Sequence, residues 1–433
     1  MLALAALGNS GLDVIFSPKI KKVGLIGSGW YGTSDVLRLI QVAPVEVTAI
    51  CDVDQQHLQT AGDLIQQRQK SGKKPRFYKD YRKMLATEPF DLVLIGSPDH
   101  WHALHAIEAM KAGADLYLQK PISRDVQEGE AIVAAAKKYN RVVQIGTQRR
   151  STPHLTEAKT QVVDAGLLGK IGRVEMCCYY HMRLNEQRPV QEVPEHFDYD
   201  FWTGPAPMLP FRGMPHRSWR SFKEYGNGIV GDMCVHMLDT VRWLLDLGWP
   251  KRISSSGGIY VQADSIANIP DTQTATFQYD DFDCIWTHRT WGNAPDPEYP
   301  WAFFIYGEKG VLKGSVHKYE FIPQGAKLPT HQGSALYEKE LFPEDVNEKG
   351  IELHVAAATR RHLLNLLQAI ETKSKPVADV LNGHISTASC IMANIAQETG
   401  TIIKYDSAQQ KVIKNKVAKD KLARDYRAPW KHV

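Results

Sequence analysis

The chain lacks several features that would narrow its function at once. None of its apolar runs reaches the length needed to cross a membrane, so no membrane-spanning helix is expected. Its six cysteines show neither a C-x-x-C pair nor a framework spacing, which indicates buried or free thiols rather than disulfides. The net charge of +4 is dispersed, and clusters such as KIKK and SGKKPR indicate solvated surface rather than a nucleic-acid site.

The 433 residues are enough for two domains with sizeable cores. The first 18, MLALAALGNSGLDVIFSP, are apolar but lack the basic start of a complete export signal. They fit two alternatives: the remnant of an export signal, which indicates a periplasmic protein, or an arm that packs on a neighbour. We therefore set residues 1–19 apart from the folded domains and leave the cytoplasmic and periplasmic locations both open.

A glycine-rich turn stands near the start of the first domain, in VGLIGSGWYGTSDVLRLI at residues 23–40. Gly27, Gly29 and Gly32 fit G-x-G-x-x-G, and the apolar run before them and the helical spacing after them predict a strand, a turn and a helix. The first glycine permits the turn, the second lets backbone approach a pyrophosphate, and the third lets helix pack on strand. Amide groups at the helix start favour phosphates, so we predict a nucleotide site.

Asp52 ends the next apolar run, VEVTAICDVD, twenty residues after Gly32. At that distance a carboxylate can accept hydrogen bonds from the hydroxyls of the adenosine ribose. It would repel the 2′-phosphate of NADP, and Val53 and Asp54 follow it in place of an arginine. The expected cofactor is therefore NAD rather than NADP.

Residues 20–150 alternate between apolar strands and helical patterns. We expect strands at KVGLIG, VEVTAIC, DLVLIGS, DLYLQKP and VVQIGTQ, and helices near 55–70, 102–112 and 126–139. This alternation predicts a doubly wound parallel sheet of the Rossmann type that binds the nucleotide, so the fold class is α/β.

The pattern changes after Arg150. One helix, at about 153–165, leads into long strands with alternating or aromatic character, such as RVEMCCYYHM, TQTATFQYDDFDCIWTHRT and WAFFIYGEKGVLKGS. They predict an α+β domain over residues 151–433, built on an open, largely antiparallel sheet that serves substrate binding and assembly. A sheet face without helices would expose apolar strands such as DCIWTHRTW, which favours a homodimer or homotetramer.

Two further motifs carry groups capable of catalysis. In GSPDHWHALH and DLYLQKP, the turn at 96–98 closes one strand and Lys120 closes the next, so the lysine can reach the nucleotide crevice. In GDMCVHMLDTVRWLL, Asp232 and His236 are four residues apart and share a helix face. Taken alone, Lys120 could be a surface lysine, and the Asp232–His236 pair is better explained as part of a helical core.

Together these motifs resemble the Gfo/Idh/MocA oxidoreductases, and the likeness extends over nearly the whole chain, through GSGWYG, QIGTQRRS, DFWTGPAP and the terminal RDYRAPW. The usual strand-end motif of that family is E-K-P, and here it stands as Gln119-Lys120-Pro121. The resemblance implies that Lys120 is the catalytic lysine and that Asp232 and His236 form the D-x-x-x-H pair. Gln119 can hydrogen-bond the nicotinamide ribose but brings no charge to it.

The chemistry of alcohol oxidation explains why these residue types are needed. Hydride leaves the carbon for the nicotinamide ring while a proton leaves the oxygen, and histidine is the side chain whose ordinary pKa suits a base near neutrality. His236 is therefore the expected base. Lys120 can hydrogen-bond the same oxygen and stabilise the charge that develops there. Asp232 would orient either the substrate hydroxyl or the imidazole.

The remaining cofactor candidates surround these motifs. His100, His102 and His105 lack the carboxylate or cysteine partners of a metal site, so no metal is expected. The resemblance implies that Trp101 and His102 close over the cofactor. The full set of expected cofactor contacts is Gly27, Ser28, Gly29, Trp30, Tyr31, Gly32, Asp52, Ser97, Pro98, His100, Trp101, His102, Gln119, Lys120 and Gln148.

A sugar pocket is expected beside these groups, because aromatic faces pack on pyranose rings and arginines donate to hydroxyls. Its candidates are Arg149, Arg150, Tyr180, His181, Trp219, Arg220 and Tyr225, each of which could equally serve packing or the surface, together with Asp232 and His236. We therefore predict an NAD-dependent oxidoreductase that acts on a secondary hydroxyl of a sugar, glycoside or polyol. The alternatives are a redox-neutral, glycoside-cleaving or sugar-modifying enzyme with tightly bound NAD and a non-catalytic sugar or NAD sensor.

Overall fold

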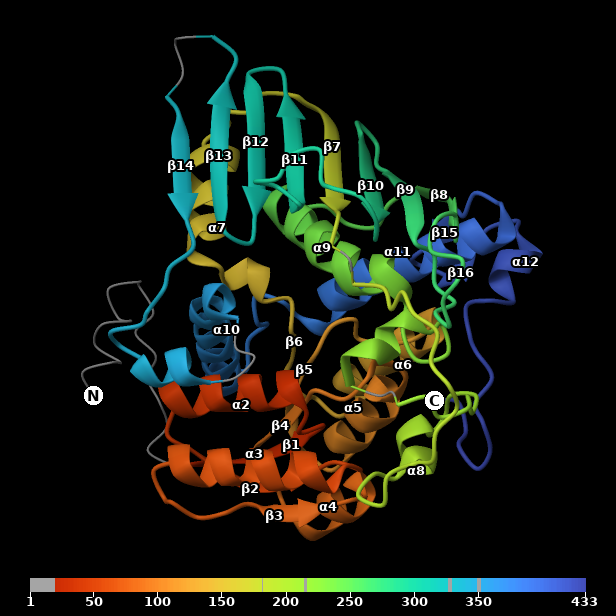
Figure 1. Ribbon diagram of the computed structural model, residues 1–433. Coiled ribbons are helices and arrows are strands. Elements are labelled where there is room, and N and C mark those ends of the chain that lie inside the picture. The colour runs from red at the N-terminus through yellow and green to blue at the C-terminus, as the bar shows by residue number, and fades with distance from the viewer. Residues whose placement is uncertain (1–19, 181, 214–215, 326–328, 349–351) are drawn as a thin grey trace.

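The computed structural model describes residues 20–180, 182–213, 216–325, 329–348 and 352–433. The predictions for residues 1–19 and for His181 therefore lie outside the described residues. Figure 1 shows a broad β-sheet stacked above a second layer of strands and helices. No helix within the described ranges is long and apolar enough to span a membrane.

The lower layer is a sheet of six strands in the order β3-β2-β1-β4-β5-β6. All neighbouring strands in it are parallel, which confirms the predicted doubly wound sheet. The strands are β1 (Lys21–Ile26), β2 (Val45–Cys51), β3 (Arg76–Tyr78), β4 (Leu92–Ile95), β5 (Asp115–Leu118) and β6 (Val143–Ile145). The sequence does not indicate β3, because three mostly exposed residues carry no readable alternation.

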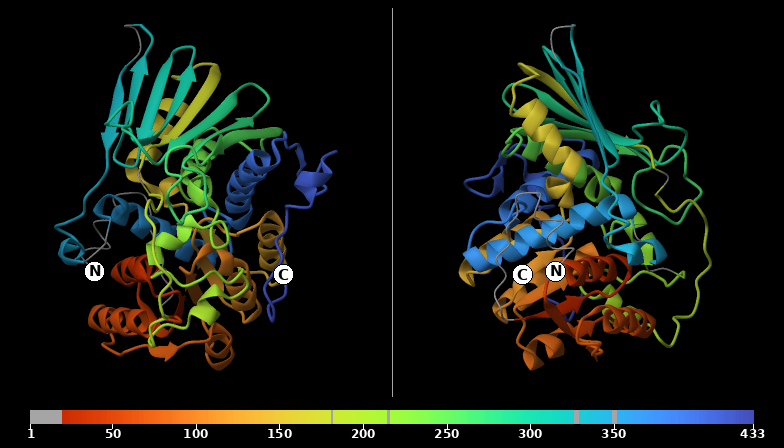
Figure 2. Two further views of the ribbon diagram at one scale, coloured as in Figure 1. Left: turned by 45° about the vertical axis from the view of Figure 1, so that its right-hand side comes forward. Right: turned by 90° about the vertical axis from the view of Figure 1, so that its left-hand side faces the viewer.

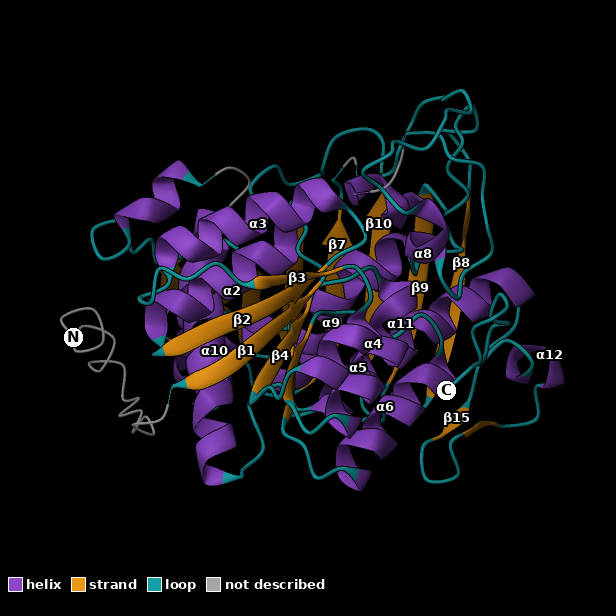
Figure 3. Ribbon diagram, turned by 90° about the horizontal axis from the view of Figure 1, so that it is seen from below, coloured by secondary structure: helices purple, strands orange, loops and turns teal. Residues whose placement is uncertain are grey.

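Helices cover both faces of this sheet, as the view from below shows (Figure 3). They are α2 (Trp30–Val42), α3 (Gln55–Arg68), α4 (Tyr81–Thr87), α5 (His102–Lys111) and α6 (Val126–Lys138). Leu25 of β1 packs with α2 and α3, whereas its neighbour Ile26 packs with α4, α5 and α6. Because both faces are buried, β1 carries no polar side chain from Val23 to Ile26, as is usual for strands of parallel sheets.

A helix from the far end of the chain completes the first of these faces. α10 (Leu353–Thr372) inserts Leu363, Leu366 and Ile370 into the cluster that contains Leu25. Both views of Figure 2 keep α10, in light blue, next to α2, in red. The chain therefore returns to the lower layer after building the upper one, and a domain boundary at residue 150 stays a prediction.

The upper layer is a sheet of eight strands in the order β14-β13-β12-β11-β7-β10-β9-β8. Its neighbours are antiparallel except for β7 and β10, which confirms the predicted open, largely antiparallel sheet. The strands are β7 (Ile171–Cys178), β8 (Arg252–Gly258), β9 (Thr272–Gln278), β10 (Asp283–Arg289), β11 (Trp301–Gly307), β12 (Gly310–Ser315), β13 (Lys318–Pro323) and β14 (His331–Ser334).

Helices pack on one face of the upper sheet, and no helix of the described residues packs on the other, which we call the open face. The remaining α-helices and strands are α7 (Pro153–Ala158), α8 (Tyr199–Thr203), α9 (Val235–Leu244), α11 (Val380–Thr399), α12 (Lys416–Lys419), β15 (Tyr405–Asp406) and β16 (Lys411–Val412), and the π-helical turn η5 (Val230–Cys234) leads into α9. Trp286 of β10 is fully buried beneath α9 and α11, whereas Ile285 and Thr287 are half-buried on the open face. The expected outward exposure of DCIWTHRTW is therefore wrong for Trp286, because strand alternation directs it into the chain's own core.

Candidate active site

A cavity of about 730 Å³ lies where β1, β4 and β5 end. β1 and β4 are neighbours although β2 and β3 separate them in the chain, so the cavity lies at the switch point where such sheets bind ligands. Asp232, His236 and Trp301, from the part of the chain that builds the upper layer, form its opposite wall. Both layers therefore contribute side chains to one site.

The glycine motif shapes one end of the cavity. Gly27 has a φ of +85°, and a Cβ atom there would lie 2.5 Å from the amide nitrogen of Ser97. A Cβ atom on Gly32 would collide with the carbonyl oxygen of Gly27, so glycine is required for α2 to approach β1. Gly29 precedes α2, and no side chain of a described residue caps that helix. This uncapped helix start fits the pyrophosphate of a dinucleotide.

Asp52 lines the same end of the cavity, directly after β2. Its Oδ2 accepts a hydrogen bond from the Ser28 amide at 2.8 Å, and its Oδ1 accepts one from the Asp54 amide at 3.0 Å. Burial raises the pKa of the carboxyl, but His57 and these amides outweigh burial and hold the pKa below its ordinary value. Asp52 is therefore ionised at neutral pH, as an acceptor for ribose hydroxyls must be.

Lys120 follows β5 and forms a buried ion pair with Asp232. Its Nζ donates to Oδ1 of Asp232 at 2.5 Å and to the backbone oxygen of the same residue at 2.9 Å. Arg220 Nε lies 3.3 Å from that Oδ1. Burial raises the pKa of Asp232, but Lys120 and Arg220 outweigh burial and lower it to about 2. The carboxylate is therefore charged at every physiological pH and fixes both cations at the cavity wall.

His236 lies on α9 and lines the cavity next to this ion pair. Its ring packs edge-on against Trp301, with 5.3 Å between ring centroids. Burial, with Lys120 and Arg149 as lesser causes, holds the pKa of His236 well below 6.5, so the imidazole is neutral and can accept a proton. Its buried Nδ1 has no hydrogen-bond partner among the described residues, and the contacts of the Asp232 carboxylate are with Lys120 and Arg220 rather than with the imidazole.

Gln119, which stands where the E-K-P motif has glutamate, is fixed by hydrogen bonds to residues of the protein. Its Nε2 donates to Oδ2 of Asp35 on α2 at 2.6 Å, and its Oε1 accepts from the Lys120 amide at 3.3 Å. Burial raises the pKa of Asp35 to about 7, against the opposing hydrogen bond from Gln119. No local pattern in the sequence pairs Gln119 with Asp35, because the two residues lie 84 positions apart.

Asp99 lines the cavity, although no motif in the sequence indicated it. It lies in the short turn η1 (Asp99–Trp101) and lines the cavity with Lys120, Arg220 and Asp232. Burial raises its pKa to about 7, although Arg220 opposes the shift. A carboxyl group that titrates near neutrality can both give and take a proton at working pH.

The sequence-predicted residues divide into two groups. Those that line the cavity are Gly27, Gly29, Trp30, Tyr31, Asp52, Ser97, Pro98, Trp101, Gln119, Lys120, Arg149, Tyr180, Trp219, Arg220, Asp232 and His236. Those that are described but lie behind its walls are Ser28, Gly32, His100, His102, Gln148, Arg150 and Tyr225. Further lining residues that the sequence did not suggest include Glu352, His354 and Trp301.

The residues behind the walls hold the lining segments in place. The His102 ring bridges the backbone oxygens of Ser97 and Pro121, each at 2.7 Å, and so ties together the turns after β4 and β5. Arg150 pairs through Nε and Nη2 with Asp239 at 2.7 and 2.9 Å in the core. These contacts place His102 and Arg150 away from direct contact with a ligand in the cavity.

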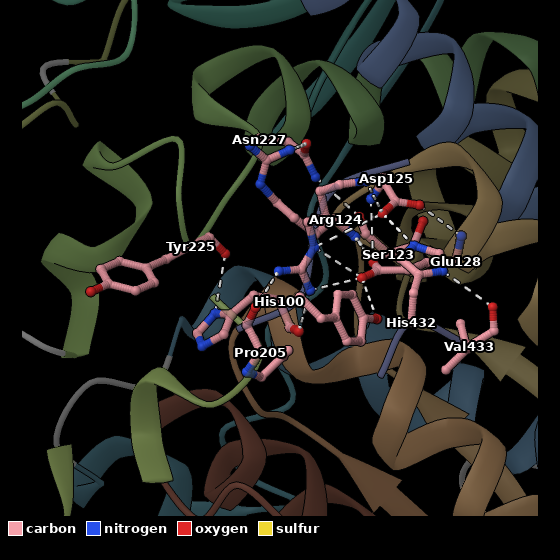
Figure 4. A network of polar contacts seen from close by, with 12 residues as sticks. His100, Ser123, Arg124, Asp125, Glu128, Pro205, Tyr225, Asn227, His432 and Val433 are labelled. Carbon is pink, nitrogen blue, oxygen red and sulfur yellow. Dashed lines mark hydrogen bonds and ion pairs between the residues drawn. The ribbon is translucent and has the colours of Figure 1, made fainter. Parts of the chain in front are cut away.

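One group of described residues has the composition of a metal site, away from the cavity. Asp125, Glu128 and His432 bring their ligand atoms within 4.8 Å of one another. Figure 4 shows that protein donors already surround these carboxylates. Glu128 Oε1 accepts from Tyr426 at 2.6 Å and from Arg424 Nη2 at 2.7 Å, and His432 Nε2 lies 2.9 Å from Asp125 Oδ2. The group fastens the C-terminal segment to the start of α6.

Two family models match the chain in succession. One, described as oxidoreductase family, NAD-binding Rossmann fold, matches residues 21–147. The other, described as oxidoreductase family, C-terminal alpha/beta domain, matches residues 157–312. The two matches correspond to the lower sheet with its cavity end and to most of the upper sheet.

Curated relatives match over part of their length. The inositol 2-dehydrogenase/D-chiro-inositol 3-dehydrogenase of Lactiplantibacillus plantarum is 28% identical over 189 residues, which cover 42% of this chain and 52% of that protein. The alpha-N-acetylgalactosaminidase of Shewanella oneidensis is 32% identical over 144 residues, or 31% of either chain. The chain thus spans about half or less of the length of these two relatives.

Solved structures match over nearly the whole fold. An oxidoreductase from Agrobacterium radiobacter, in complex with NAD+, L-tartaric acid and magnesium, has a TM-score of 0.67 at 15% identity. The match covers 89% of this chain and 98% of that one. At this identity the likeness shows a shared fold.

Proposed function

This chain belongs to the Gfo/Idh/MocA oxidoreductase family, and we propose that it transfers hydride between NAD and a secondary hydroxyl of a sugar, glycoside or polyol. The observation that carries the proposal is the placement of Lys120, Asp232 and His236 in one cavity with the glycine motif and Asp52. The residues suited to a dinucleotide and the residues suited to proton transfer therefore line the same cavity. The inositol dehydrogenase among the relatives supports a polyol or sugar as substrate.

The cofactor end fits NAD on the geometry of its own residues. The uncapped start of α2 after Gly29 suits the pyrophosphate, and the ionised Asp52 suits the adenosine ribose. Ser97 and Gln119 line the cavity between that end and Lys120. NAD, when bound, supplies the hydride acceptor for the oxidation. We assign cofactor binding to residues 20–150 and substrate binding with assembly to residues 151–433.

The proton chemistry is assigned to groups of the chain. The neutral imidazole of His236 accepts the proton of the substrate hydroxyl, since its low pKa keeps it unprotonated. Lys120 Nζ donates a hydrogen bond to the same oxygen and stabilises the negative charge that develops there. Asp232 acts through Lys120, because its carboxylate is engaged by Lys120 and Arg220 rather than by the imidazole.

The test is an assay of NADH formation over a panel of inositols, aldoses and anhydrosugars. The expected result is NAD binding and NADH formation with at least one member of the panel, and loss of that activity in His236→Ala. Accumulation of free NADH in this assay would distinguish a dehydrogenase from an enzyme that retains its cofactor and produces no net NADH. A protein that binds neither NAD nor NADH by calorimetry would contradict the proposal.

A second candidate is a redox-neutral, glycoside-cleaving enzyme that retains NAD. The relative described as an alpha-N-acetylgalactosaminidase favours it, and so does Asp99, a cavity carboxyl with a pKa of about 7 that can serve as a second acid or base. This candidate predicts NAD that copurifies with the protein and aglycone release without net NADH. A protein that binds sugar and NAD without any turnover would instead be a sensor.

The proposed partners are a small sugar-like substrate and further copies of this chain. The open face of the upper sheet presents Ile285, Phe304 and Ile322 beside charged side chains, and no helix of the described residues covers them. Burial of that face against its equivalent would give a homodimer or homotetramer.

A further inference from the structure

Arg149 differs from every other deeply buried arginine among the described residues. The others have protein partners: Arg38 and Arg360 bond carboxylates, Arg150 bonds Asp239, Arg183 bonds three backbone oxygens, and Arg242 bonds Ser386 and backbone oxygens. Arg149 is 2% exposed, yet its Nε and Nη1 have no hydrogen-bond partner in the described ranges. Its guanidinium forms no ion pair with a described residue either.

This guanidinium lines the cavity. Arg149 lies in the short 3-10 helix η2 (Gln148–Ser151), which follows β6. Its guanidinium lies against the indole of Trp301, with 5.3 Å from Cζ to the ring centroid. Burial lowers the pKa of Arg149, yet arginine stays protonated in proteins. A buried unpaired cation is unfavourable, and proteins normally pair such a charge or keep it for a ligand.

The charges around Arg149 leave the substrate end of the cavity positive. Glu352, the carboxylate that acts on Arg149 through space, is an exposed residue at the rim and forms no ion pair with it in the described structure. Deeper in the cavity, Lys120 and Arg220 share the single carboxylate of Asp232, and burial raises the pKa of Asp99 to about 7, so that its carboxyl is only partly ionised at neutral pH. Cationic groups therefore outnumber the anionic ones in the interior.

The histidines nearest to Arg149 do not alter this balance. Burial, with Arg149 as a further cause, lowers the pKa of His354 to about 3 and the pKa of His154 to about 4. His317 packs against His354, with 4.5 Å between ring centroids, and burial and Arg149 lower its pKa as well. These rings are neutral at pH 7, so none adds a second cation and none supplies a counter-charge.

We propose that Arg149 binds an oxyanion carried by the substrate, so that the preferred substrates are acidic sugars such as uronic acids or sugar phosphates. The guanidinium offers parallel N–H donors that match a carboxylate or a phosphate, and binding would pair the buried charge. The inference rests on the proposed oxidoreductase function and names its substrate class.

The geometry places this oxyanion site within reach of the reacting group. Arg149 and His236 both contact Trp301, each at 5.3 Å from the indole centroid. A sugar ring in the cavity beside these two side chains can therefore direct its acidic substituent to Arg149 and a secondary hydroxyl to His236.

The test is calorimetry of ligand binding to the NADH-bound protein at constant ionic strength. Two matched pairs, D-glucuronate with D-glucose and D-galacturonate with D-galactose, isolate the carboxylate, and D-glucose 6-phosphate tests a phosphate. We expect at least one acidic ligand to bind about 10- to 100-fold more tightly than its neutral partner. Preference for the phosphate alone or for the uronates alone identifies the source of the oxyanion.

Variants of Arg149 test whether this residue causes the tighter binding of acidic ligands. In Arg149→Met the ratio of acidic to neutral affinity should fall to about one, and Arg149→Lys should retain part of it. Arg173→Gln removes an exposed positive charge of β7 and should keep the full ratio. Equal affinities within every pair in the wild-type protein would overturn the inference, and so would a preference that survives in Arg149→Met.

Thermal unfolding without ligand gives a second readout. Arg149→Met should raise the midpoint temperature of unfolding, because it removes an unpaired buried charge. Arg150→Met should lower that temperature, because it leaves the buried carboxylate of Asp239 without its partner. A lowered midpoint in Arg149→Met would indicate a structural role and overturn the inference. A protein that oxidises neutral sugars without acidic preference overturns the inference alone, whereas absence of NADH binding overturns the proposed function.

Discussion

The ammonium nitrogen of Lys120 lies 2.5 Å from Oδ1 of Asp232, and Arg220 Nε lies 3.3 Å from the same oxygen. Lys120 comes from the lower sheet and Asp232 from the helix that supports the upper one, 112 residues later. The ion pair therefore joins the two layers at the cavity. Its position leaves the imidazole of His236 free of Asp232, so orientation of Lys120 is the role that the contacts give to the carboxylate.

We expect Lys120→Ala and His236→Ala each to lower the rate of hydride transfer by about a hundredfold to ten-thousandfold, as the loss of a positioned acid or base does. NADH affinity should change little. If both groups act on one oxygen, as proposed, the double variant should be far less than multiplicatively worse. Single-turnover transfer with a confirmed substrate measures the rates, and Lys111→Ala, an exposed lysine of α5, is the control.

Asp232→Asn separates orientation from proton transfer. It keeps the side-chain shape and removes the charge, so it should lower the rate of hydride transfer less than His236→Ala does if the carboxylate only positions Lys120.

The rate of hydride transfer should also depend on pH in a defined way. Because the pKa of His236 lies well below 6.5, the rate should not fall as pH decreases through the ordinary histidine range. Near-wild-type transfer by His236→Ala from about pH 6 to about pH 9 would show that the base lies elsewhere.

Asp52 should determine the choice of cofactor. We expect NAD to bind at least about tenfold more tightly than NADP, since a 2′-phosphate would lie against an ionised carboxylate. Asp52→Ala should narrow this difference, and Asp63→Ala, which removes an exposed carboxylate of α3, should leave it unchanged. Calorimetric titration of each cofactor into each protein measures the ratio, and equal affinities in the wild type would contradict the assignment.

Asp99 should make stability depend on pH in a predictable direction. Its pKa rises from 3.8 in the unfolded chain to about 7 in the fold, so the stability it contributes is fully present below the lower value and is lost as pH rises toward the upper one. Asp99→Asn removes this loss. The difference in free energy of unfolding should grow in favour of the variant, at about 1.4 kcal/mol per pH unit, and level off above about pH 7.

Urea unfolding of the protein without cofactor at several pH values measures this difference. Asp280→Asn, which removes an exposed carboxylate, is the matched control. A difference that is constant over the whole interval would mean that Asp99 is ionised in the folded protein throughout.

The open face of the upper sheet should be an interface between copies of the chain. Light scattering at micromolar concentration should give the mass of a dimer or tetramer. Ile285→Lys places a charge at the centre of that face and should shift the mass toward the monomer, because a buried unpaired charge opposes association. A monomer in the wild-type protein would contradict this expectation.

The sequence by itself determined the lower sheet and the end of the cavity that the glycine motif and Asp52 line. The glycine spacing, the apolar runs and Asp52 lie within one continuous stretch, and neighbouring residues act on one another over short distances in the chain. For the same reason the sequence indicated that the strands of this sheet are parallel, whereas β3 and α4 were too short to give a periodic pattern.

Only the tertiary structure decided which side chains share the cavity and in what state of charge. The contacts of Gln119 with Asp35 and of Asp232 with Lys120 join positions 84 and 112 residues apart, and no local pattern encodes such pairings. Arg149 and Arg150 are adjacent in sequence and identical in type, yet one faces the cavity unpaired and the other is bonded to Asp239. Burial and the identity of distant neighbours create this difference, and both exist only once the chain is folded.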